Sequence, residues 1–190
     1  MFWTLFAVLA CVQPTLVEIS YETDEVNFEE PPYVEIFSLL KEPVREGDWE
    51  RPPTVFVCGQ TPITEGRVSK AMHVWKRLGY EMFGPFMNSN LPVCRGEKDF
   101  SWGNIIIRLR GQNFPEDKLA VTRAYRRVED QRLVGAIIEI QNFAAEKERT
   151  MEHEFGHALG WKHFNRKYHL MNAIHPYGGW DTYGLRSLPR

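Results

Sequence analysis

The segment 153–163, whose sequence is HEFGHALGWKH, contains three histidines and a glutamate at spacings that could bind a metal ion. A helix has 3.6 residues per turn, so His153 and His157 project from the same side and can bind one metal ion. Gly160 can adopt a left-handed conformation and end the helix, which allows His163 to turn back as a third ligand. Three neutral imidazoles without a cysteine suit zinc, and they leave its fourth position open to water, as in catalytic sites.

Glu154 follows the first histidine directly, where its carboxylate could take a proton from a water molecule. Hydrolysis of an amide needs a nucleophile, stabilisation of the oxyanion and a proton for the leaving amine. Zinc would supply the first two, because it lowers the pKa of water to about 7 and polarises a carbonyl group. Glu154 would then serve as the general base. The alternative is a surface helix with solvated histidines, but the added glycine and third histidine make the pattern much more specific than H-E-x-x-H alone.

The segment resembles the metzincin clan of zinc endopeptidases, whose pattern H-E-x-x-H-x-x-G-x-x-H is matched at every fixed position. Met171, eight residues after the last histidine, corresponds to the clan's methionine turn at the spacing of the matrixins. The resemblance implies a peptide or protein substrate, one catalytic Zn²⁺ and an apolar floor beneath the metal formed by Met171. It assigns the metal to His153, His157 and His163, and the general base to Glu154.

The residues after the third histidine make the chain matrixin-like without placing it in a named family. Phe164 stands where matrixins have serine, astacins glutamate and reprolysins aspartate. Pro176 and Tyr177 resemble the matrixin wall of the S1′ pocket, although they come two residues later than that pattern expects. Ala173 occupies the place of the zinc-binding tyrosine of astacins and serralysins, so no such ligand is expected. No matrixin motif for calcium or a structural zinc is recognisable, which leaves Ca²⁺ open.

Length and composition indicate one domain with an appended segment. The chain has 190 residues, 43% of them hydrophobic, and a net charge of −2. It has no phosphate-binding loop and no basic stripe, so we expect no nucleic acid partner. We divide it into an apolar N-terminal segment (1–17), an acidic, proline-containing arm or pro-segment (18–53) and a catalytic domain (54–190). The oligomeric state stays open.

The first twelve residues are apolar and uncharged, which is too short to span a bilayer but is the length of a signal-peptide core. They favour a secreted or cell-envelope protein, although no Lys or Arg precedes them. Two alternatives remain: lipidation of Cys11 after cleavage, or retention of the segment as an anchor or in a larger particle. Contact with a membrane is expected only through this segment.

The remaining cysteines and the acidic arm bear on export and latency. Cys58 and Cys94 could form a disulfide, in agreement with export, and two buried free thiols are the alternative. No cysteine lies between Cys11 and Cys58, so the matrixin cysteine switch is absent. Gly47-Asp48 resembles the aspartate switch of astacin pro-peptides, but a solvated acidic linker is the favoured interpretation.

The element order predicts an α+β fold of the α/β type. We expect strands at 54–58, 104–110, 119–125 and 134–141, with the last two forming a hairpin. Helices are expected from the cap Thr64 to Gly79, over 145–159 and, briefly, over 180–185. By resemblance this is a metzincin-like zincin fold: a twisted mixed sheet, a backing helix, an active-site helix and a short C-terminal subdomain after His163. Substrate would pair with an exposed edge strand, for which 119–125 is the candidate.

Two other functions fit the same motif. The first is a zinc-stabilised structural or binding domain with a metzincin fold in a larger assembly. The second is a hydrolase of non-peptide amides such as peptidoglycan cross-links. A base beside an open coordination position favours catalysis over a purely structural role.

Overall fold

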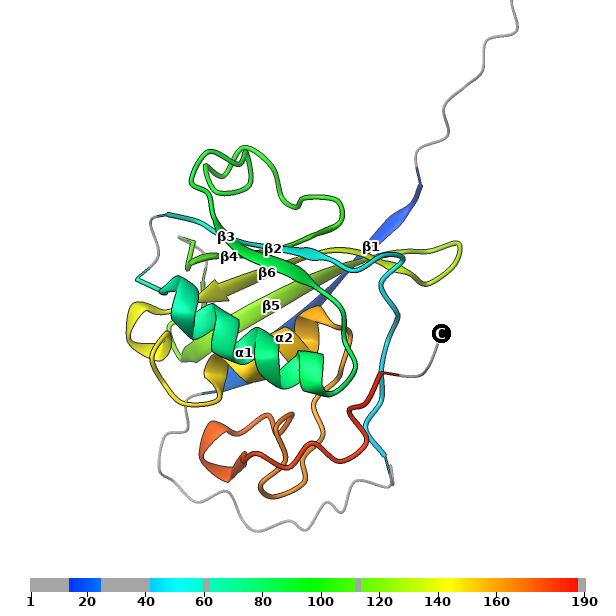
Figure 1. Ribbon diagram of the computed structural model, residues 1–190, viewed down its shortest axis with the longest axis vertical. Helices are drawn as coiled ribbons and strands as arrows, with labels where there is room; N and C mark the ends of the chain where they lie inside the picture. Colours follow the sequence, from blue (N-terminus) through cyan, green and yellow to red (C-terminus); the bar gives the residue numbers. More distant parts are fainter. Residues whose placement is uncertain (1–13, 25–41, 60–61, 112–113, 188–190) are drawn as a thin grey trace, which may run out of the picture.

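A mixed six-stranded sheet with two helices on one face forms the body of the protein (Figure 1), which confirms the α+β class. The computed structural model describes residues 14–24, 42–59, 62–111 and 114–187. The strand order is β1-β5-β6-β4-β2-β3. The elements are β1 (Leu16–Asp24), β2 (Thr54–Val57), α1 (Glu65–Arg77), β3 (Phe83–Met87), β4 (Asn104–Leu109), β5 (Lys118–Arg127), β6 (Leu133–Ile140), the 3₁₀ turn η1 (Asn142–Ala144), α2 (Thr150–Ala158) and the 3₁₀ turn η2 (His175–Tyr177).

Parallel and antiparallel pairing divide the sheet into two parts. β2 pairs in parallel with β3 and β4, and β4 pairs in parallel with β6. β5 is antiparallel to both of its neighbours, β6 and β1. The predicted hairpin is therefore confirmed. Every residue of β6 is buried, as expected for a strand covered on both faces.

Helix α1 begins and ends where the sequence predicts. The hydroxyl of Thr64 accepts a hydrogen bond from the amide of Arg67 at 3.1 Å, which satisfies one free donor of the first turn. Gly79 follows the helix with φ +94°, a conformation that glycine adopts without strain. The buried face carries Val68, Ala71, Met72 and Trp75.

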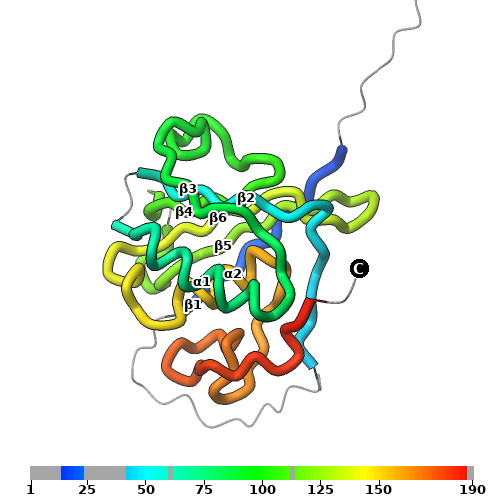
Figure 2. Tube along the Cα trace, viewed as in Figure 1, coloured from blue at the N-terminus to red at the C-terminus, as the bar shows by residue number. Residues whose placement is uncertain are grey.

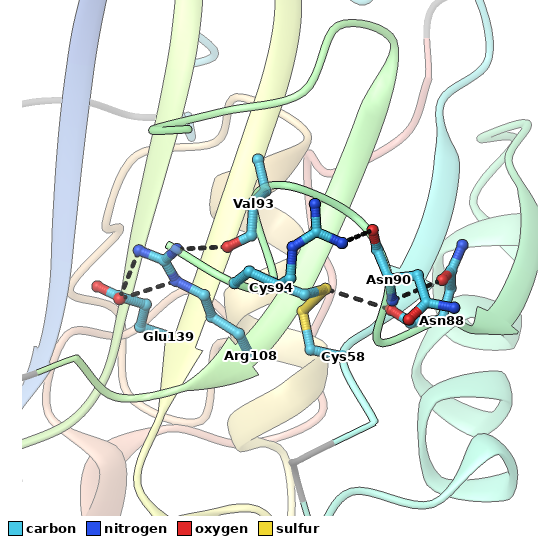
Figure 3. The surroundings of a disulfide bond; sticks show 8 residues. Cys58, Asn88, Asn90, Val93, Cys94, Arg108 and Glu139 are labelled. Carbon is cyan, nitrogen blue, oxygen red and sulfur yellow. Dashed lines mark hydrogen bonds and ion pairs between the residues drawn. A yellow bond between two sulfur atoms is a disulfide. The ribbon is translucent and has the colours of Figure 1, made fainter. Parts of the chain in front are cut away.

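Each face of the sheet is covered by different material. Beneath it, α1 and α2 pack on the larger core. Above it, the connection between β3 and β4 lies over a smaller apolar cluster that includes Val93 and Ile106. The predicted disulfide between Cys58 and Cys94 is present and fastens this connection to the end of β2 (Figure 3).

Ion pairs on the upper face fix the same connection. Glu139 of β6 is almost fully buried and pairs with Arg108 and Arg123. Arg108 also donates to the carbonyl of Val93 at 2.9 Å, so one guanidinium joins the sheet to the disulfide-bonded connection (Figure 3).

Three expectations about regular elements are wrong. Helix α2 begins at Thr150 rather than 145, because Arg149 has φ 67° and the residues before it form turns. Residues 180–185 form a bridge and a turn instead of a helix. No strand was expected at β3, because Phe83–Met87 contains glycine and proline.

The strand at 119–125 was expected to be an exposed edge of the sheet, and this expectation is wrong. β5 lies between β1 and β6, and β1 pairs with it from Leu16 to Asp24. In Figure 1, β1 (blue) runs along β5 and passes α2. The edges of the sheet are β1 and β3.

The packed unit also includes residues that were expected to be an arm. β1, at residues 16–24, is part of the sheet. The segment 42–53 packs against the region after α2 and lies beside the last described residues (Figure 2). Trp49 is 4% exposed and donates to the carbonyl of Ala158 at 2.9 Å. The amide of Glu46 donates to the carbonyl of Gly160 at 2.8 Å. The expected boundary at Thr54 is therefore not where packing begins.

The N-terminal predictions fall mainly outside the described part of the chain. Residues 1–13, with Cys11, and 25–41 are not described. Within the described residues, no helix has the length and apolar character needed to cross a membrane.

Candidate metal centre

Helix α2 presents His153 and His157 from one side, as their spacing requires. Its end follows the prediction: Gly160 has φ +95° and donates its amide to the carbonyl of His157 at 2.8 Å. The chain then turns back, and the amide of Phe164 donates to the carbonyl of Met171 at 2.7 Å. This turn brings His163 to the two helical histidines.

The three histidines converge through their Nε2 atoms. Nε2 of His157 lies 2.9 Å from Nε2 of His153 and 3.0 Å from Nε2 of His163. A tetrahedral zinc ion with bonds of about 2.0–2.1 Å holds its ligand atoms roughly 3.3 Å apart. These three residues form a cluster that could hold a metal ion.

Backbone carbonyls determine which ring nitrogens of His153 and His157 are free to bind a metal ion. Nδ1 of His153 lies 2.7 Å from the carbonyl of Leu170, and Nδ1 of His157 lies 2.7 Å from the carbonyl of Trp161. A carbonyl only accepts, so each Nδ1 must carry the proton and each Nε2 of a neutral ring is left with a lone pair. Such carbonyl contacts orient the histidines of metal sites.

The electrostatics of the cluster favour neutral rings and a bound cation. Burial lowers the pKa of His153 to about 3, with a further lowering from His163, and burial also lowers the pKa of His157 well below its ordinary value. With both rings neutral and both Nδ1 atoms protonated, the Nε2 lone pairs of His153 and His157 face each other at 2.9 Å, which is repulsive unless a cation lies between them. The geometry and protonation of the cluster therefore fit a metal ion.

Met171 packs against helix α2. It is fully buried and packs against Gly156. A β-carbon at Gly156 would overlap the Met171 sulfur, and would lie 2.7 Å from Met171 Cε and 2.9 Å from Trp75. His169 supports this turn: its Nδ1 accepts from the amide of Met171 at 3.1 Å.

Glu154 is fully buried between two threonine hydroxyls. Thr23 of β1 donates to Oε1 at 2.6 Å, and Thr122 of β5 donates to Oε2 at 2.5 Å. Burial raises the pKa of Glu154 to about 7, although both threonine hydrogen bonds act in the opposite direction. A carboxyl group with this pKa can exchange protons near neutral pH.

Tyr21 of β1 covers His157, one of the three clustered histidines. Its ring stacks on the His157 ring, with centroids 4.3 Å apart and planes 8° from parallel. Its hydroxyl donates to a carboxylate oxygen of Glu46. Burial and this carboxylate raise the pKa of Tyr21 above its ordinary value, so the hydroxyl keeps its proton.

The sequence analysis missed Tyr21, Thr23 and Thr122. Thr23 and Thr122 are 131 and 32 residues from Glu154, so no local spacing connects them with the motif. A signal for β1 was present, because Val17, Ile19, Tyr21 and Thr23 alternate with polar residues in the two-residue period of a strand. The change in composition near residue 18 concealed it.

The other candidate residues are not members of the cluster of three histidines. Asp48 pairs with Arg45. Pro176 and Tyr177 form the 3₁₀ turn η2 with exposed side chains, and the carbonyl of Tyr177 accepts from the amide of Tyr168 at 2.7 Å. Their assignment to a pocket wall stays a prediction.

No protein-family model matches the chain, and no curated protein is significantly similar to it in sequence.

Proposed function

We propose that this protein is a zinc-dependent endopeptidase of metzincin type, with His153, His157 and His163 as ligands and Glu154 as general base. The observation that carries the proposal is the convergence of three Nε2 atoms, two of them within 3.0 Å of the third, together with the full burial of Glu154, the residue that follows His153 in the sequence. A His₃ set without cysteine suits zinc and leaves a position for water.

The fold supports this proposal beyond the motif. α2, which bears two ligands and the base, contacts β5 and β6, and α1 packs beside it. Arg67 of α1 donates to both carboxylate oxygens of Glu152 at 2.7 Å, and Trp75 donates to the Glu152 carbonyl at 2.8 Å. These contacts hold α2 against α1. A helix of this kind beside the active-site helix is what the metzincin resemblance implies. The disulfide agrees with an extracytoplasmic or secreted protein.

The chain's own residues provide the proton transfers in this mechanism. Zinc, when bound, would act as a Lewis acid and bring the pKa of water to about 7. Glu154 Oε1 or Oε2 would accept a proton from the attacking water and deliver it to the leaving amine nitrogen. The Nδ1 contacts of His153 and His157 with backbone carbonyls would keep the ligand tautomers fixed during the reaction.

Substitution of Glu154 tests the proposal directly. Glu154→Gln keeps the size of the side chain and one acceptor oxygen, but its amide group cannot accept the proton. We expect the variant to retain one zinc per chain by elemental analysis and to hydrolyse a mixed peptide library at least about a hundredfold more slowly.

Controls separate the chemistry from folding. Glu148→Gln, an exposed residue just before α2, should leave hydrolysis unchanged. A chelator should abolish hydrolysis by the unsubstituted chain, and added zinc should restore it. Hydrolysis by Glu154→Gln at the unsubstituted rate would refute the assignment of the base.

A zinc-stabilised binding or structural domain is the second candidate. It is favoured by the coverage of the site, because β1 places Thr23 on Glu154 and Tyr21 on His157. In this alternative the metal would stabilise the fold, and no peptide would be cleaved under any condition.

A further inference from the structure

β1 lies on the metal centre as an added peptide strand would. It pairs antiparallel with β5 over nine residues, from Leu16 to Asp24. Adding an extended peptide to a sheet edge is a common mode of peptide recognition, in which alternate side chains enter the site. In β1 these alternate residues are Ile19, Tyr21 and Thr23, and all three lie toward the core.

The side chains of β1 engage the groups that catalysis would require. Thr23 donates to the carboxylate of the proposed base, and Tyr21 stacks on a proposed metal ligand. The segment Tyr21–Thr23 thus spans the site from ligand to base. A substrate reaching the same groups from the same edge would collide with β1.

Apart from the backbone pairing with β5, the outer side chains of β1 make contacts of the kind that form and break at a surface. Glu18 and Glu22, on its outer side, are about half exposed and pair with Arg123 and Lys118 at 3.6 and 3.5 Å. Exposed ion pairs of this kind contribute roughly 0–1 kcal/mol each. Attachment on the inner side centres on the Tyr21–Glu46 hydrogen bond and the Thr23–Glu154 hydrogen bond.

We propose that β1 is an intramolecular occupant of the substrate groove, so that the site is latent while β1 pairs with β5. A peptide substrate would add to β5 in the place of β1, with an aromatic side chain where Tyr21 stacks on His157. This inference rests on the proposed peptidase function for its consequence, but displacement of β1 can be tested without any hydrolysis.

A disulfide lock in the full chain provides the main test. Ser20 and Arg123 are paired across β1 and β5 on the outer side of the sheet, so Ser20→Cys with Arg123→Cys would tie the strands together when oxidised. We expect the oxidised form to hydrolyse the peptide library at least about tenfold more slowly than its reduced form, because locking removes the open population. Arg123→Cys alone controls for loss of the Glu139 ion pair, and the unsubstituted chain in the same reductant controls for Cys58–Cys94.

A matched pair of double variants tests the two sides of β1. Tyr21→Ala/Thr23→Ala removes the inner contacts, and Ser20→Ala/Glu22→Ala changes the outer side of the same strand. In a zinc-loaded Glu154→Gln background we would measure fluorescence anisotropy with a labelled synthetic peptide of residues 14–24. We expect it to bind the inner-side variant about tenfold more tightly than the outer-side variant, and not to bind the oxidised lock.

The outcomes distinguish the two proposals. Equal hydrolysis by the oxidised and reduced lock, with Glu154-dependent cleavage in both, would overturn the role of β1 and leave the peptidase intact. Peptide binding that follows the expected order without hydrolysis in any Glu154-containing chain would support displacement of β1 and refute the peptidase. If Tyr21→Ala/Thr23→Ala does not fold, the lock alone decides, since its two states are compared within one variant.

Discussion

At the scale of single residues, Gly156 is the point where the ligand helix meets the methionine turn. Its missing side chain lets Met171 pack directly against α2, between the two helical histidines in sequence. The motif fixes the histidines, the glutamate and Gly160, but it allows any residue at position 156. The need for glycine there comes from packing.

Gly156→Ala should therefore destabilise the protein. The added methyl group overlaps Met171 and meets Trp75 at 2.9 Å, and overpacking of this kind costs about 1–3 kcal/mol. The matched control is Gly66→Ala in α1, where an added β-carbon meets nothing within 4 Å. That change should range from neutral to a gain of about 1 kcal/mol, because alanine is the better helix former.

Urea unfolding of both variants measures the difference. Equal free energies of unfolding for Gly156→Ala and Gly66→Ala would show that Met171 yields without cost, and would contradict the packing described here.

The convergence of the three histidines was predictable because their relation is local. His153 and His157 are four residues apart on one helix, and Gly160 ends that helix with the predicted left-handed conformation. The partners of Glu154 were not predictable, since Thr23 and Thr122 reach it from two strands through the pairing of β1 with β5. Sequence spacing carries information within an element and loses it across a sheet.

At the scale of elements, the same distinction separates the helix α1 from the strands β1 and β3. A cap, an apolar stripe and a terminal glycine specify α1 locally. β3 depends on its neighbour: Phe83 and Phe86 are exposed edge residues, and only parallel pairing with β2 makes the segment a strand. β5 is an interior strand because β1 pairs with its outer side. The composition of the segment that contains β1 had indicated an arm outside the domain.

The disulfide also acts at the scale of elements, because it fastens the connection between β3 and β4 to the end of β2. Replacing both Cys58 and Cys94 by alanine should lower the free energy of unfolding by about 3–4 kcal/mol, since the bond closes a loop with a sequence separation of 36. Urea unfolding measures this loss, and the unsubstituted chain in reductant should show a similar one. If reduction left the unfolding free energy unchanged, the ion pairs of Glu139 would suffice to hold the connection.

At the scale of the whole molecule, the metal centre links stability to pH. In the metal-free chain burial lowers the pKa of His153 to about 3 and lowers that of His157 and His169 from the ordinary 6.5. Below pH 6.5 the unfolded chain binds protons that the native state does not, so stability falls as the pH falls. Glu154 acts in the opposite sense between pH 4.5 and 7, because its native pKa is raised to about 7.

The histidines outnumber the carboxyl group, so acid should destabilise the metal-free protein. With at least one net proton taken up on unfolding, we expect a loss on the order of 1.4 kcal/mol per pH unit between about pH 6 and 4.5. Urea unfolding of chelator-treated protein at pH 6, 5.5, 5 and 4.5 measures the slope. A free energy of unfolding that rises on acidification would show that the rings of His153, His157 and His169 are not held neutral.

β1 and the proposed substrate groove belong to the same chain, so occupancy of the groove by β1 is an intramolecular equilibrium. Residues 25–41 connect Asp24 to the segment that carries Glu46, so strand and groove cannot be separated by dilution. A tethered segment acts at an effective concentration that reaches the millimolar range for short linkers. To displace β1, a free peptide needs a concentration that is as high, relative to its own dissociation constant, as the effective concentration of β1 is relative to that of β1. Under our proposal the threshold for cleavage is therefore set within each molecule, and the fraction of open sites is the same at any protein concentration.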